Sequence, residues 1–112
     1  MNRLNDIEFI GGNYIQLKFN IYKPDGTPLD LSQCSNIEWK MRYYGELEES
    51  ILTKTLKDGV MISNSNIANV ILQSEDTADL AGKFVHQISL LDGDNKLFIP
   101  VQGNIIIHKN IN

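Results

Sequence analysis

The sequence predicts an all-β protein: an antiparallel β-sandwich of about seven to nine strands, with a small closed barrel as the alternative. Apolar and polar side chains alternate strictly from Tyr14 to Tyr22, which is typical of a half-buried strand. Turn signals rich in Gly, Pro, Asp and Asn recur at intervals of about ten residues, as expected between short strands. No segment carries an amphipathic helical pattern of useful length.

The N-terminal half divides into short strands separated by turns. We expect strands at residues 6–10, 14–22 and 36–44, and a brief extended piece at 29–31. Residues 23–28 contain Pro-Asp-Gly, the turn chemistry that ends the second strand. One face of the strand 36–44 is apolar and is expected to point inward: Ile37, Trp39, Met41 and Tyr43.

The middle of the chain predicts three further strands and one helical turn. The strands are expected at residues 51–56, 60–63 and 67–73. A single helical turn follows, for which Ser74 is the expected N-cap and Gly82 the closing residue.

The C-terminal part predicts a hairpin and one last strand or strand pair. Residues 83–91 alternate again, and residues 92–95 read Asp-Gly-Asp-Asn, a hairpin signal. The last strand or pair is expected at 97–101 and 104–108. Pro100 cannot donate a backbone hydrogen bond, which favours a sheet edge or a bulge at that point.

Composition limits the possible functions. A chain of 112 residues with 42% apolar and 21% charged residues fits one folded domain over residues 1–112. Its net charge of −4, with scattered basic residues, argues against nucleic-acid binding. The single Cys34 excludes an internal disulfide and favours a small buried loop thiol. No apolar run approaches a membrane span, so we expect no membrane association and synthesis in a reducing cytoplasm.

No catalytic, cofactor or metal site is expected. His86 shares a face with apolar neighbours and is interpreted as a core or rim histidine; a metal site with His108 would need both histidines and a carboxylate to meet. Residues 92–95 lack the later glutamate of a calcium loop, and Asp25 and Asp30 are interpreted as turn formers.

Acid–base pairs and nucleophiles are also unsupported by the pattern. Paired carboxylates would have to come from Glu8 and a solvated loop holding Glu46, Glu48 and Glu49. The serines lack a Gly-x-Ser-x-Gly context, and the phosphate-loop and dinucleotide patterns are absent from the sequence. We therefore predict that the protein is not an enzyme.

Two stretches of sequence carry a resemblance to a known family. Residues 17–31 read "strand, Asp-Gly turn, Pro-Leu-Asp-Leu", and residues 37–42 continue as Ile-Glu-Trp-Lys-Met-Arg. The later part of the motif matches at five positions: Asp76, Thr77, Leu80, Gly82 and Phe84. This layout resembles the immunoglobulin-like domains of tailed-bacteriophage structural proteins, and is most similar to the upper-baseplate N-terminal domain.

An antibody-type domain fits less well. Residues 75–78 resemble the Asp-Thr-Ala run of antibody variable domains, but the chain has no cysteine pair. Phe84 also lacks the hydroxyl that a tyrosine corner requires.

The phage resemblance implies a non-catalytic virion protein. It would be a component of a baseplate, tail, fibre or capsid decoration, and its partners would be other virion proteins in a homo- or hetero-oligomer. Binding would use strand edges and sheet faces, and no cofactor is implied.

Three outward tyrosines are the candidate interface residues: Tyr14, Tyr22 and Tyr44. Tyrosine is enriched at protein interfaces and can also stack on sugar rings. A carbohydrate-binding sandwich module is therefore the alternative function. The apolar run Ile105–Ile107 would be an aggregation hazard if exposed, so it is expected to lie in a central strand or against another subunit.

Overall fold

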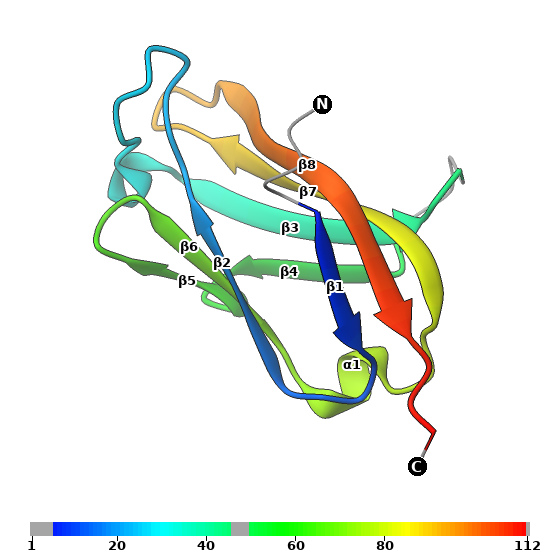
Figure 1. Cartoon of the computed structure of the whole chain (residues 1–112). Helices are drawn as coiled ribbons and strands as arrows, with labels where there is room; N and C mark the ends of the chain where they lie inside the picture. The colour runs from blue at the N-terminus through cyan, green and yellow to red at the C-terminus, as the bar shows by residue number, and fades with distance from the viewer. Residues whose placement is uncertain (1–5, 46–49, 112) are drawn as a thin grey trace.

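The computed structural model describes residues 6–45 and 50–111 (Figure 1). Within these residues the strands form one eight-stranded sheet, in the order β1-β8-β7-β3-β4-β5-β6-β2. The strands are β1 (Ile7–Ile10), β2 (Ile15–Asn20), β3 (Asn36–Tyr43), β4 (Leu52–Leu56), β5 (Gly59–Ser63), β6 (Ile67–Leu72), β7 (Gly82–Leu91) and β8 (Leu97–His108). The described residues also contain two short helical turns: the 3₁₀ turn η2 (Leu31–Gln33) and α1 (Ser74–Thr77).

The sheet is mixed and strongly curled. Five of its neighbouring pairs are antiparallel, but β1 pairs with β8 and β4 pairs with β5 in the parallel direction. The ribbon curves so that its two end strands, β1 and β2, both lie on the near side in Figure 1, with β3 and β4 behind them. The all-β prediction is confirmed, whereas the expectation of purely antiparallel pairing is wrong for two pairs.

The residues that form the core follow the predicted alternation of apolar and polar side chains. In β2, Leu17 and Phe19 are buried while Lys18 between them is exposed. Ile37, Trp39 and Met41 of β3 are buried in the same way, as is Phe84 of β7. Tyr43, which was expected on the same inward face of β3, is instead 45% exposed. One apolar cluster, which includes residues from β2, β3, β5, β6, β7 and β8, fills the concave side of the curled sheet.

Trp39 and His86 form a hydrogen-bonded pair inside this cluster. The indole Nε1–H of Trp39 donates to Nδ1 of His86 over 3.0 Å. The ring of His86 also lies 5.6 Å, centroid to centroid, from the ring of Phe19 on β2. Because β2 and β7 are far apart in the strand order, this contact shows that the curled sheet packs against itself.

The turn between β1 and β2 is closely packed. Gly11 N–H donates to the carbonyl of His108 at the end of β8, and Gly12 N–H donates to the hydroxyl of Thr77 in α1. The side chain of Asn110 donates in turn to the carbonyl of Gly11. This turn therefore joins β1, α1 and the segment after β8 at one end of the sheet.

A partly buried ion pair holds α1 against the sheet. Lys54 Nζ of β4 lies 2.9 Å from Asp76 Oδ2, and both side chains are 16% exposed. The same carboxylate oxygen accepts the backbone N–H of Gln73, which is the N-cap residue of α1. The Lys54 side chain passes over Gly59, where an added Cβ would lie 2.5 Å from Lys54 Cδ.

Several local expectations differ from the structure. The piece expected to be extended at 29–31 contributes no strand: Asp30 instead caps η2, which begins at Leu31. The N-cap of α1 is Gln73 and not Ser74, and Gly82 begins β7 instead of closing the helical turn. The last strand is continuous across Pro100 and Gly103, with a register irregularity opposite Ile88 and Leu90.

In the described part of the chain, no helix has the length and apolar character needed to span a bilayer.

Candidate interaction surface

Among the described residues, the first half of β8 has an open backbone edge. β1 pairs only with Ile105–His108 of β8, so within the described residues Leu97–Gly103 has β7 as its only neighbouring strand. Just beyond this segment, Asn104 N–H donates to the Asp6 carboxylate over 2.9 Å, on the side where β1 lies. An edge of this kind presents unpaired amide and carbonyl groups to solvent and can receive another strand.

The side chains at this edge are apolar and exposed. Leu97, Phe98 and Ile99 are 62%, 43% and 50% exposed, and Leu97–Gly103 carries no charged residue. Exposed edges are usually protected by charged side chains. Here the protection is limited to Pro100 and the neighbouring register irregularity. We call Leu97–Gly103 the β8 edge surface. The sheet edge or bulge predicted at Pro100 is confirmed within the described residues, whereas the exposure of Leu97, Phe98 and Ile99 was not predicted.

The following apolar run lies in a different environment. Ile105 and Ile107 are buried, and the run lies between β1 and β7 in the sheet. The expectation that this strand would be central is therefore confirmed for Ile105–Ile107. Ile106, on the outer face, is 39% exposed; the exposure is greater at the other end of the same strand and at Ile111, which is 93% exposed.

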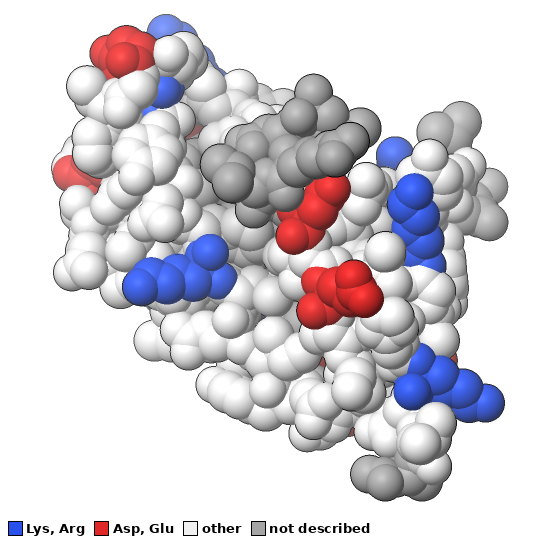
Figure 2. All heavy atoms as spheres, in the orientation of Figure 1, with Lys and Arg blue, Asp and Glu red and all other residues white. Residues whose placement is uncertain are grey.

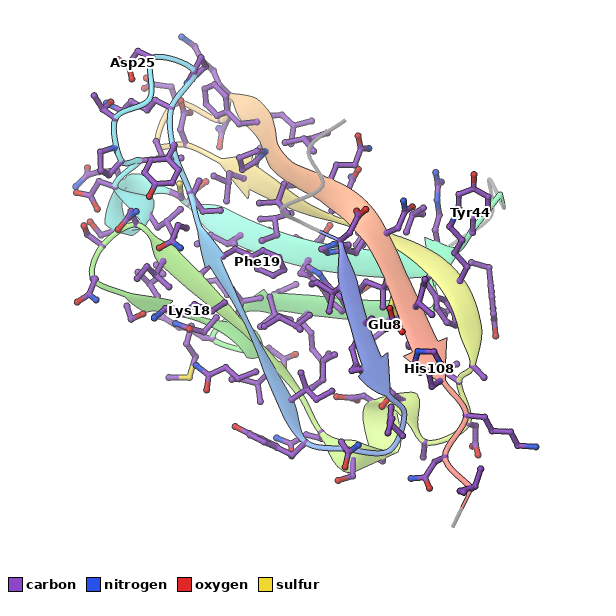
Figure 3. All side chains as sticks on the ribbon, in the orientation of Figure 1. Glu8, Lys18, Phe19, Asp25, Tyr44 and His108 are labelled. Carbon is purple, nitrogen blue, oxygen red and sulfur yellow. The ribbon has the colours of Figure 1, made fainter. Side chains whose placement is uncertain are left out.

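The three candidate tyrosines are exposed but do not form one surface. Tyr14, Tyr22 and Tyr44 are 60%, 53% and 56% exposed. Tyr14 precedes β2, Tyr22 follows it, and Tyr44 follows β3 on the far side of β8 from Glu8 in Figure 3. Tyr44 is partnered by Lys83, whose Nζ lies 4.0 Å from the ring centroid. Their exposure agrees with the prediction, and their role at an interface stays a prediction.

The two histidines lie on opposite faces of the sheet. His86 is 2% exposed and its Nδ1 accepts the Trp39 hydrogen bond, as expected for a core histidine. His108 is exposed and contacts Glu8 of the neighbouring strand β1 (Figure 3). Because the two imidazoles do not meet, they cannot bind one ion together. The described residues contain no group of three or more side chains suited to holding a metal ion.

The aspartates of the loops form turns, as predicted. Asp25 Oδ1 accepts from both the backbone N–H and the hydroxyl of Thr27, and Asp30 Oδ1 accepts likewise from Ser32. The hydroxyl of Thr27 is the main cause that lowers the pKa of Asp25, and the hydroxyl of Ser32 lowers the pKa of Asp30. Asp92 Oδ1 accepts the N–H groups of Asp94 and Lys96, which closes the hairpin between β7 and β8.

The carboxylates considered for acid–base chemistry are only partly described. Glu46, Glu48 and Glu49 lie outside the described residues. Glu8 is paired with His108 on the outer surface, and 60% of its side chain is exposed, which is not the enclosed setting of a catalytic acid–base pair.

Cys34 is partly buried in the connection between η2 and β3, at the edge of the core cluster. Burial raises the pKa of its thiol, and the negative charges of Asp92 and Asp30 raise it further. A higher pKa means less thiolate at a given pH, and the thiolate is the reactive form.

We expect the Cys34 thiol to react slowly with Ellman's reagent. In the folded chain, the pH at half-maximal rate should lie above that of the urea-unfolded chain. Asp92→Asn removes one charge but keeps an oxygen that can accept the turn hydrogen bonds, so it should shift the profile towards lower pH. An identical profile in folded and unfolded protein would contradict this expectation.

Comparison of the chain with protein-family models gives no match, and comparison with curated protein sequences gives none either.

Proposed function

We propose that this chain is a non-catalytic, immunoglobulin-like interaction module of a tailed-bacteriophage particle. It would serve as a component of the baseplate, tail, fibre or capsid decoration and would bind other virion proteins. The observation that carries the proposal is the β8 edge surface, an uncharged strand edge that is open among the described residues and has three exposed apolar side chains. Such an edge favours assembly with another chain.

The strand arrangement supports the immunoglobulin-like part of the proposal. The order can be divided into a five-stranded layer, β1-β8-β7-β3-β4, and a three-stranded layer, β5-β6-β2. Contact between Phe19 of β2 and His86 of β7 brings the two layers together. Trp39 lies on β3, between β7 and β4 in the larger layer, and its ring is fully buried. Opposed layers around a central buried tryptophan are typical of immunoglobulin-like sandwiches.

The phage origin is tested by the composition of purified particles. Particles are induced from the source genome, banded on a density gradient and digested for mass spectrometry. Peptides of this chain should copurify with intact particles in a constant ratio to the major tail or capsid protein. Their absence from particles, while the protein is detected in the same lysate, would overturn the proposal.

The role of the β8 edge surface is tested by placing a charge on it. Ile99→Lys should strongly reduce incorporation of the chain into particles, because a lysine opposes both strand addition and apolar contact. Asn20→Lys, a lysine on an exposed position of β2, is the matched control and should be incorporated normally. The measurement is the amount of each variant in particles assembled without the wild-type chain. Circular dichroism should show that both variants fold, and equal incorporation of the two would exclude this edge as the binding surface.

A further inference from the structure

Two rows of side chains cross the outer face of the sheet next to β1. In the first row, Glu8 of β1 lies opposite Ile106 of β8, and Ile106 lies opposite Lys83 of β7. The three positions point away from the core, because their neighbours Phe84, Ile105 and Ile107 are buried. The row therefore reads acid, apolar, base across three adjacent strands.

The second row repeats this pattern one step along the strands. Asp6 accepts a hydrogen bond from Asn104 of β8, which lies opposite Val85 of β7, and Val85 lies opposite Arg42 of β3. This row reads acid, uncharged, uncharged, base. Figure 2 shows acidic groups near the centre of this view and basic groups to their right, with uncharged atoms between them.

The acids and bases of these rows are not paired with each other within one chain. Among the described residues, Glu8 forms its ion pair with His108, and no ion pair involves Lys83 or Arg42. Lys83 lies over the Tyr44 ring instead. With neighbouring strands about 4.8 Å apart, Glu8 and Lys83 are about 10 Å from each other along the row. Lys83 and Arg42 thus have no acidic partner among the described residues, and in a complex Glu8 would exchange its contact with His108 for a base of the partner.

We propose that this two-row surface (Asp6, Glu8, Asn104, Ile106, Lys83 and Arg42) binds a second copy of the same chain. A two-fold axis near Ile106 would bring Asp6 and Glu8 of one copy over the bases of β7 and β3 in the other, and the reverse. A surface of this kind is self-complementary, which is what a two-fold dimer requires. Ile106, which is 39% exposed, would meet its symmetry mate at the centre.

The dimer should be weak and sensitive to salt. Two rows across four strands make a smaller footprint than the roughly 800 Å² per partner of a standard interface. Its charges remain near solvent, so added salt screens them over a Debye length of about 10 Å at 0.1 M. Sedimentation equilibrium at concentrations from about 10 μM to 1 mM, which cover dissociation constants in that range, is therefore the appropriate measurement.

Charge reversal tests the pairing directly. Glu8→Lys alone and Lys83→Glu alone each place like charges opposite one another at two symmetry-related contacts. Each single variant should show a dissociation constant raised at least about tenfold. An equimolar mixture of the two variants should regain the dimer, because both contacts of the mixed dimer are again between opposite charges. The double variant carrying both changes in one chain should dimerise for the same reason.

The controls separate this pairing from a general effect of charge. Lys18→Glu and Glu75→Lys make the same reversals at exposed positions outside the two rows and should leave dimerisation unchanged. A wild-type chain that stays monomeric throughout the range, or a mixture of the two single variants that stays monomeric, would overturn the inference. The result is independent of the phage proposal, because a chain absent from particles can still dimerise through this surface.

Discussion

Replacing Trp39 with alanine is expected to lower the free energy of unfolding by about 3–5 kcal/mol, the usual cost of removing a fully buried tryptophan side chain. The ring of Trp39 is fully buried at the centre of the core cluster, and its indole nitrogen is bonded to His86. Since small domains have a total stability of about 5–15 kcal/mol, the variant should be close to unfolding at 37 °C. Urea denaturation followed by far-ultraviolet circular dichroism measures the change.

The hydrogen bond within this pair can be separated from the packing by a double-mutant cycle. Trp39→Phe removes the donor and His86→Leu removes the acceptor, and each leaves one buried polar group without this partner. Together the two changes remove both members of the bond, so the double variant should be more stable than the sum of the single losses by about 0.5–1.5 kcal/mol. Strict additivity would show that the Trp39–His86 bond contributes no stability.

Replacing Gly11 with alanine is the second substitution expected to have a large effect. A Cβ at this position would lie 2.6 Å from the carbonyl oxygen of Thr77 and 3.0 Å from that of Leu80. Both are backbone atoms, so the turn or α1 must move, and the hydrogen bonds that join them must lengthen. Overpacking of this kind costs about 1–3 kcal/mol, which should appear as a lower midpoint of urea denaturation.

Gly93→Ala is the matched control for this substitution. At Gly93 the added Cβ would meet only the carbonyl oxygen of Gln33, at 3.6 Å, which is ordinary van der Waals contact. Its midpoint should stay near that of the wild type. Equal midpoints for the two alanine variants would contradict the tight packing of α1 against the turn between β1 and β2.

The positions of the strands and of the core could be predicted from the sequence because alternation is a local property. The period of two from Ile15 to Asn20 identified β2, and the same pattern identified β3 with Trp39 on its buried face. The turn-forming roles of Asp25 and Asp30 could also be predicted from the sequence, because their hydrogen bonds reach only two residues along the chain.

The pairing of the strands could not be predicted in the same way. Nothing near Ile7 indicates that β1 lies parallel to β8, because register depends on contacts between distant segments. The β8 edge surface and the two charged rows follow from that pairing. Leu97–Ile99 is as apolar as Ile105–Ile107 in sequence, but among the described residues only the second run has β1 beside it, and there Ile105 and Ile107 are buried. The N-cap of α1 was missed because Gln73 is a less favoured capping residue than Ser74.

Because β1 pairs in parallel with β8, the first strand of the chain can join the sheet only after the last strand has been synthesised. The hydrogen bond from the backbone N–H of Asn104 to the carboxylate of Asp6 spans 98 positions of the chain, and contacts this distant slow the search for the native state. While the ribosome is still synthesising the last strand, β1 has no place in the sheet and Ile7 and Phe9 have no β8 to pack beside. Nascent chains should therefore become resistant to protease only after His108 has left the exit tunnel.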